Sequence, residues 1–108
     1  MMDNKPMKEG NLDQFNTVCN KRLDKIKSVL QAKGKEYVSG SDRYHNFNVA
    51  ARVLGTSREE ALLGMAVKHY VSILDIIEQP GRFSDEMIDE KIGDMINYLI
   101  LLEGMLLE

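Results

Sequence analysis

The chain has 108 residues, of which 44% are hydrophobic and 29% charged, and a formal net charge of −3. This length suits one domain, and the balance of apolar and charged residues is that of a globular rather than a disordered protein. The charge lacks the basic excess of nucleic-acid binders, so we expect no nucleic-acid partner. The single cysteine, Cys19, excludes an intrachain disulfide and fits the reducing cytoplasm.

Residues 1–10 contain a proline and a glycine and no apolar period, and they lack the apolar core of a signal peptide. We therefore expect a flexible leader at residues 1–10 and a single helical domain at residues 11–108. The most apolar segment, residues 95–107, is shorter than the roughly 20 residues that a membrane span needs. The sequence predicts a soluble protein without a membrane-spanning helix.

The first helix is predicted at residues 12–33. Its apolar residues recur at steps of three and four, which is the spacing of one buried helical face. They are Leu12, Phe15, Cys19, Leu23, Ile26 and Leu30. Asn11 suits the start of this helix and Gly34 its end. A loop is predicted at residues 35–43.

Three more helices are predicted: a short one at residues 44–54, which Gly55 ends, and two long ones. The first long helix covers residues 58–78, because Thr56 and Ser57 each stand three residues before a glutamate, the spacing of a capping box. Pro80 and a glycine interrupt the chain before the last helix, which begins at Ser84. The sequence therefore predicts an all-α antiparallel bundle of three long helices and one short helix.

The last helix is almost entirely apolar from Ile92 onward, so we expect it to be buried on most sides. A polar stripe nevertheless runs along it at Glu90, Asp94 and Asn97, with Tyr98 beside it. Because an unpaired buried charge is costly, these side chains need partners.

The preceding long helix has a matching polar stripe at Lys68, Ser72 and Asp75. If the two helices are antiparallel neighbours, Asp75 approaches Glu90 or Asp94. One interpretation is a Mg²⁺ site made of carboxylates on facing helices, with Lys68 as a phosphate contact. The other is a buried polar network in which Lys68 pairs with Asp94 or Asp75, since such networks imitate functional sites.

The remaining reactive side chains are expected to have structural roles only. His45 is interpreted as a partly exposed loop residue and His69 as a residue off the polar stripe. Cys19 lies in an apolar stripe and is expected to be a buried thiol. No cluster of histidine and cysteine has the spacing of zinc ligands.

Four short motifs follow one another between about residues 30 and 102. They are Lys33-Gly-Lys-Glu36-Tyr37, Asp42-Arg-Tyr-His-Asn46-Phe47, Lys68, and Glu90…Asp94…Tyr98. This series resembles the all-α nucleoside triphosphate pyrophosphohydrolases, the MazG-like and dUTPase-like group, and most closely the small phage-encoded members. Two acidic spacings depart from the family pattern. The nearest match to its Glu-x-x-Glu pair is Asp75-x-x-Glu78, and its Glu-x-x-Asp pair is one residue wider here.

The resemblance implies Mg²⁺-dependent cleavage of a (deoxy)nucleoside triphosphate to the monophosphate and pyrophosphate. It implies Asp75, Glu90 and Asp94 as metal ligands, with Lys68 and Asp75 as catalytic residues. The implied substrate contacts are Lys35, Tyr37, Arg43, Asn46, Phe47, Asn97 and Tyr98. It further implies a homo-oligomer, dimer or tetramer, in the cytoplasm, which is the host cytoplasm if the chain is phage-encoded.

Two other functions stay open. A catalytically silent phage-type protein on the same fold would bind or inhibit a host component, and it predicts acids paired with lysines and closed to solvent. A helix-turn-helix pattern at residues 48–61 suggests a DNA-binding module with an exposed, basic-rimmed helix at residues 57–66. We rank this alternative lowest, because Glu59 and Glu60 would face the DNA phosphates.

Overall fold

The computed structural model describes residues 10–32 and 42–108. Its helices are α1 (Leu12–Ile26), the π-helical turn η1 (Lys27–Ala32) that continues α1, α3 (His45–Leu54), α4 (Arg58–Glu78) and α5 (Asp85–Leu106). The predicted all-α bundle of three long helices and one short helix is confirmed. Gly34, most of the predicted loop and nearly all of the predicted leader lie outside the described residues.

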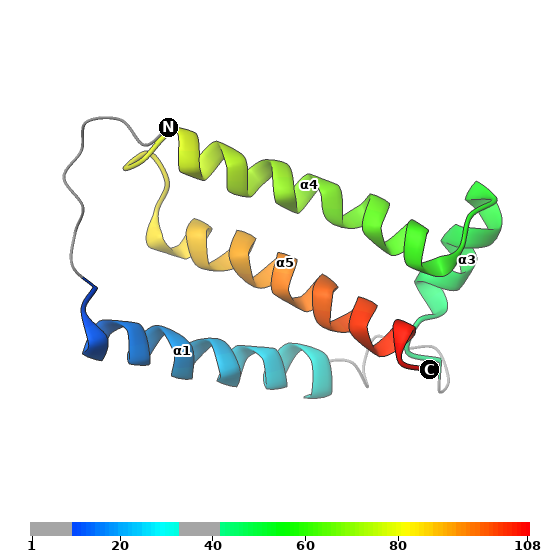
Figure 1. Ribbon diagram of the computed structural model, residues 1–108, viewed down its shortest axis with the longest axis horizontal. Helices are drawn as coiled ribbons and strands as arrows, with labels where there is room; N and C mark the ends of the chain where they lie inside the picture. Colours follow the sequence, from blue (N-terminus) through cyan, green and yellow to red (C-terminus); the bar gives the residue numbers. More distant parts are fainter. Residues whose placement is uncertain (1–9, 33–41) are drawn as a thin grey trace.

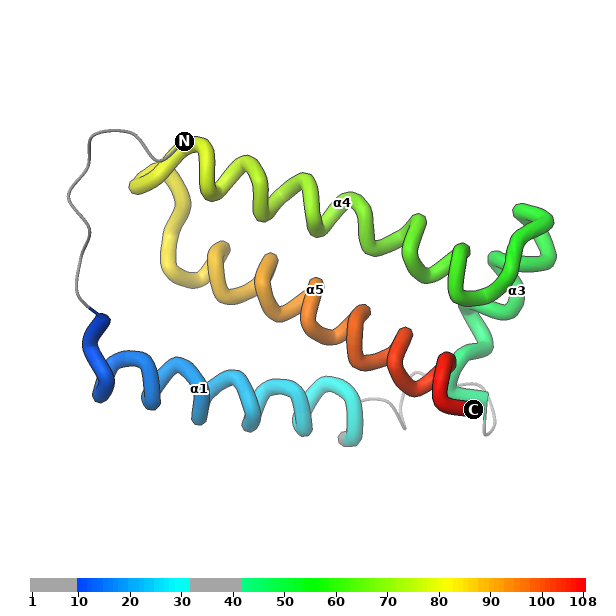
Figure 2. Tube along the Cα trace, viewed as in Figure 1, coloured from blue at the N-terminus to red at the C-terminus, as the bar shows by residue number. Residues whose placement is uncertain are grey.

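Helix α5 lies between α4 and α1 (Figure 1). The turn at residues 79–84 folds α5 back against α4, so these two helices form an antiparallel hairpin. Helix α1 runs opposite to α4 and in the same direction as α5. The short helix α3 packs on α4, and Figure 2 shows its start beside the C-terminal end of α5.

Side-chain caps set most of the helix starts, as predicted. The Asn11 side chain accepts a hydrogen bond from the backbone N–H of Gln14 at 3.0 Å, and Ser84 accepts one from Met87 at 3.2 Å. Gly55 ends α3 with a φ of 71°, a left-handed conformation that favours glycine. These local signals explain why the predicted helix boundaries agree with the structure.

Helix α4 begins with a capping box at Ser57 and Glu60. Ser57 Oγ accepts a hydrogen bond from the Glu60 N–H at 3.1 Å, and Glu60 Oε1 accepts one from the Ser57 N–H at 3.2 Å. Thr56, which has the same spacing to Glu59, instead donates its hydroxyl to the Ser57 carbonyl at 3.0 Å. Of the two capping boxes that the sequence predicts, the one between Ser57 and Glu60 forms and the one between Thr56 and Glu59 does not.

The buried hydrophobic core of the described residues is small. Its members are Ala51, Ala61, Leu62, Ala66 and Met105. The core therefore lies where α3, the first half of α4 and the last turn of α5 meet. None of the helices in the described ranges combines the length and apolar character needed to cross a membrane.

Two predictions of burial are wrong for the single chain. Helix α1 has no buried residue, and Leu12 and Phe15 of its apolar face are 72% and 62% exposed, while Cys19 is half-buried. Helix α5 is not buried on most sides, because Gly93 and Met105 are its only buried residues. Helices α4 and α1 cover two sides of α5 and leave other apolar surfaces open.

Replacing Ser57 with alanine should lower the free energy of unfolding by about 1 kcal/mol, since the Glu60 N–H at the start of α4 loses the Ser57 Oγ that accepts its hydrogen bond. Thr56→Ala is the matched control and should cost clearly less, because the Thr56 hydroxyl caps no N–H group. Urea unfolding followed by circular dichroism measures both. Equal losses would contradict this account of the cap.

Candidate functional site

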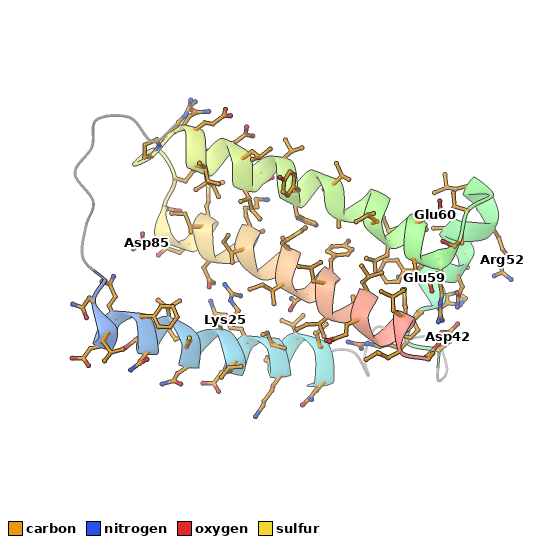
Figure 3. All side chains as sticks on the ribbon, viewed as in Figure 1. Lys25, Asp42, Arg52, Glu59, Glu60 and Asp85 are labelled. Carbon is orange, nitrogen blue, oxygen red and sulfur yellow. The ribbon has the colours of Figure 1, made fainter. Side chains whose placement is uncertain are left out.

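A pocket of about 310 Å³ lies between the end of α1 with η1 and the middle of α5. Its lining residues come from both sides and are mostly polar. They are Arg22, Lys25, Ser28, Val29, Asp89, Glu90, Gly93, Asp94 and Asn97. Figure 3 shows Lys25 of α1 on the side that faces α5. The pocket therefore joins the predicted polar stripe of α5 to cations of α1.

Asp89 ties α1 to α5 through two cations. Arg22 Nη2 donates hydrogen bonds to the Asp89 backbone carbonyl at 2.9 Å and to Asp89 Oδ1 at 2.8 Å. Lys25 Nζ donates to Asp89 Oδ2. The Lys25 hydrogen bond, together with the charges of Arg22 and Lys21, holds the pKa of Asp89 below its ordinary value. This cluster fixes one wall of the pocket.

Gly93 makes room for the Arg22 guanidinium. Gly93 is buried, and a Cβ at this position would overlap Arg22 Nη1 and approach its Cζ to 3.2 Å. Although the end of an arginine side chain is flexible, this one is held by two hydrogen bonds to Asp89. Glycine at position 93 therefore allows the close contact between α1 and α5.

Asp94 also faces α4, where it meets His69. His69 Nδ1 lies 3.5 Å from Asp94 Oδ2, which makes an ion pair when the imidazole is protonated. The imidazole packs against Tyr98 with ring centroids 5.1 Å apart, and Phe47 of α3 meets Tyr98 edge-on at 6.2 Å. His69 therefore lies on the α4 face that contacts α5, a different side of α4 from the exposed Lys68 and Asp75.

The structure brings several predicted site residues together. Glu90, Asp94 and Asn97 line one pocket, and Phe47 contacts Tyr98. Four of these five residues lie on α5 and Phe47 lies on α3, so the contact between Phe47 and Tyr98 joins the second and the fourth motif.

The other predicted catalytic residues are not part of this group. Asp75 is exposed on α4, and within residues 10–32 and 42–108 no three His, Cys, Asp or Glu side chains are close enough to hold a metal ion. Asp75 therefore does not join Glu90 and Asp94. Lys68 is exposed, and neither of its predicted pairs, with Asp94 or Asp75, occurs among the ion pairs of the described residues.

Arg43 is half-buried in the turn before α3, and Asn46 is exposed in its first turn, on the same short element as Phe47. Lys35 and Tyr37 lie outside the described residues. The substrate contacts predicted from the first motif thus have no placement here, whereas those of the second motif lie on α3.

Sequence reasoning missed Arg22, Lys25 and His69 as parts of this site. Arg22 and Lys25 stand on the polar face of the first helix, where nothing local distinguishes a solvated cation from one that binds Asp89. The sequence did mark His69. It lies seven residues after Leu62 and four after Met65, a spacing that puts all three residues on one face of the helix.

No protein-family model matches this chain, and neither a curated protein nor a solved structure matches it.

Acid should weaken the attachment of α1. Because the pKa of Asp89 in the folded chain lies below its ordinary value of 3.8, its contribution to stability is complete above that value and is lost as pH falls through the lowered pKa. The Asp89 side chain is 40% exposed, so we expect a contribution of only about 1 kcal/mol. Asp89→Asn should remove it at neutral pH.

Urea unfolding between pH 7 and pH 3 measures this effect. Asp89→Asn should show a shallower loss of stability with acid than the unaltered chain, whereas Asp24→Asn, an exposed carboxylate on α1, should keep the full loss. Identical pH profiles for all three proteins would rule out Asp89 as the anchor.

Gly93→Ala should destabilise the chain, because the added Cβ displaces the Arg22 guanidinium from Asp89. With Arg22→Ala already present, the same change should be neutral or stabilising, since alanine favours a helix over glycine by about 1 kcal/mol. A double-mutant cycle of unfolding free energies measures this coupling. The same effect of Gly93→Ala in both backgrounds would contradict the proposed contact.

Proposed function

We propose that this chain binds a nucleoside triphosphate in the pocket between α1 and α5 and cleaves it, with Mg²⁺, to the monophosphate and pyrophosphate. The observation that carries the proposal is the pocket lining, in which Glu90, Asp94 and Asn97 meet the cations Arg22 and Lys25. Oxygen ligands and cations in one small pocket suit a metal-bound phosphate chain.

The donor set fits Mg²⁺ shared with a substrate. Glu90 and Asp94 offer carboxylate oxygens and Asn97 an amide oxygen, which are the hard ligands that Mg²⁺ prefers. Mg²⁺ commonly takes one or two carboxylates and completes its shell with water and phosphate, so a third protein acid is not required. When bound, the ion supplies a Lewis acid that polarises the phosphate and lowers the pKa of an attacking water. The geometry gives no support to Asp75 as a further ligand.

The charges of the pocket make nucleotide binding depend on the metal. Two cations, Arg22 and Lys25, face three carboxylates, Asp89, Glu90 and Asp94, which leaves a formal charge of −1. The negative pocket repels the negatively charged triphosphate when no metal is bound. A bound divalent cation changes the formal charge of the pocket from −1 to +1, so the pocket then attracts the triphosphate. We therefore expect nucleotide binding only when Mg²⁺ is present.

The aromatic residues next to the pocket offer a surface on which the base of a nucleotide could stack. Tyr98 follows Asn97 on α5, and Tyr98 and Phe47 are both half-buried, so each keeps some open ring surface. His69 joins this pair to Asp94 by packing on Tyr98. Lys68, the exposed residue before His69, is proposed to contact phosphate.

Solvent access favours the enzyme over the catalytically silent alternative. That alternative predicts acids paired with lysines and closed to solvent. Glu90 is exposed and the Asp94 side chain is 37% exposed, and Asp94 meets His69 rather than a lysine. Among the ion pairs that residues 10–32 and 42–108 make with one another, Asp89 is the pocket acid that pairs with a lysine.

The start of α4 does not support the DNA-binding alternative. Instead of forming a basic rim, Arg58 pairs with Glu59 at 3.1 Å and with Glu108 at 2.7 Å. Its guanidinium also lies 5.1 Å from the ring centre of Tyr44 and donates to the Met105 carbonyl. Through these contacts, Arg58 holds α3, α4 and the end of α5 together.

The proposal includes self-association in the cytoplasm. A free, half-buried Cys19 suits a reducing compartment. Large apolar side chains are exposed on all the long helices of the described part, which supports a homo-oligomer such as a dimer or tetramer.

The test is a hydrolysis screen over common ribo- and deoxyribonucleoside triphosphates with Mg²⁺, with pyrophosphate as the measured product. Asp94→Asn should lower kcat/KM by at least about 100-fold, because a lost metal ligand removes several kcal/mol of charge stabilisation. Glu86→Gln is the matched control, since Glu86 is an exposed acid of α5 outside the pocket, and it should keep full activity.

Absence of turnover with every nucleotide by the folded chain would overturn the enzymatic proposal and leave the binding protein as the better one. Equal activity of Asp94→Asn and the unaltered chain would show that the reaction takes place elsewhere.

A further inference from the structure

The two cations of the pocket bind Asp89 in unequal ways. Arg22 Nη2 donates two hydrogen bonds, to the Asp89 backbone carbonyl at 2.9 Å and to Asp89 Oδ1 at 2.8 Å. Lys25 Nζ donates one, to Asp89 Oδ2. The Arg22 side chain is 18% exposed and the Lys25 side chain 52%. One cation is therefore enclosed by the protein, and the other stands half in solvent.

Arg22 belongs to the contact line between the first helix and the rest of the chain. Four half-buried residues of α1 and η1 recur at steps of three and four, which places them on one side of the helix. They are Cys19, Arg22, Ile26 and Leu30. Arg22 lies within this line and fills the space beside the buried Gly93 of α5. Moving its guanidinium would break both hydrogen bonds and open the contact between the helices.

Lys25 lies off this line. It is exposed and precedes the half-buried Ile26 by one residue, and its ammonium group reaches Asp89 at the end of a flexible four-carbon stem (Figure 3). An exposed ion pair of this kind contributes little to stability. If Lys25 leaves Asp89, the carboxylate keeps Arg22 as a partner. The release of Lys25 therefore costs the fold little.

The pocket offers Lys25 a second place to bind. Lys25 lines it together with Glu90, Asp94 and Ser28, which lies one turn further along. The ion pair of Arg22 with Asp89 is neutral, so the attraction of the pocket for a phosphate chain depends on Lys25 and on Mg²⁺ held by the other two acids. A lysine ammonium suits phosphate oxygens because it is a compact point charge with three donors.

We propose that Lys25 is a phosphate-binding residue that leaves Asp89 when a polyphosphate enters the pocket, while Arg22 stays on Asp89 and holds α1 in place. The inference rests on the function proposed for this pocket and assigns separate roles to its two cations. Lys25 exchanges a carboxylate for a phosphate, and Arg22 still neutralises the carboxylate that Lys25 leaves. The pocket can then bind its ligand without losing the wall that α1 provides.

The probe for the test is inorganic tripolyphosphate with Mg²⁺, because it carries the phosphate chain without a base or a sugar. Isothermal titration calorimetry measures its Kd for the full chain. Lys25→Met should raise this Kd by about tenfold or more, since a charge-assisted hydrogen bond is lost, and Lys25→Arg should keep most of the affinity. Lys27→Met is the matched control, because Lys27 is an exposed lysine outside the pocket, and it should leave the Kd unchanged.

The thiol of Cys19 reports whether α1 stays in place. Cys19 is half-buried on the contact line and is the only cysteine of the chain, so a thiol reagent modifies this position alone. Arg22→Met should speed the modification several-fold and lower the urea midpoint, because α1 loses its anchor. Lys25→Met should change both much less. This readout separates a loss of phosphate binding from a loss of structure.

Three results would overturn the inference. They are the absence of tripolyphosphate binding by the folded unaltered chain, an unchanged Kd in Lys25→Met, and a thiol rate in Lys25→Met as high as in Arg22→Met. Nucleotide hydrolysis with an unchanged kcat/KM in Lys25→Met would also overturn it and leave the proposed function standing. Tripolyphosphate binding that requires Lys25, in a chain that hydrolyses no nucleotide, would support the inference and count against the enzymatic proposal alone.

Discussion

The attachment of Arg22 and Lys25 to Asp89 is the interaction on which the position of α1 against α5, and with it the pocket, depends. Helix α1 has no buried residue, and Cys19 and Ile26 of its apolar face are only half-buried, so apolar packing on the described residues holds it weakly. Two cations and one carboxylate fix it along α5 instead, and Gly93 permits the approach. Without this cluster the pocket would lose one wall, and the acids of α5 would face open solvent.

Helix α5 carries polar and apolar residues on two different sides. Its polar residues Glu90, Asp94 and Asn97 line the pocket, while the apolar residues two positions before them, Ile88, Ile92 and Met95, are exposed or half-buried. Two positions correspond to about 200° around the helix, so the apolar side of α5 lies away from the pocket. The site is therefore reached without passing over the apolar side.

Much of the fold follows from local signals, and much of the site does not. The capping box at Ser57, the cap at Ser84 and the glycine at position 55 act over a few residues, so the sequence predicts the helices within about a turn. The contact between Arg22 and Asp89 spans 67 positions, and no local pattern marks it. Apolar periodicity shows which side of a helix is apolar, but it does not tell whether the rest of the chain covers that side: the apolar side of α1 is exposed in the structure.

The π-helical turn η1 gives the pocket a property of its own. Ser28 and Val29 of this turn line the pocket, and a π-helix closes each hydrogen bond over five residues rather than four. One wall is therefore made of backbone in which each hydrogen-bonded ring holds one residue more than in the α-helix before it. Deleting a single residue from η1 would turn all later side chains of that helix by about 100°, so the pocket wall is sensitive to chain length as well as to side-chain identity.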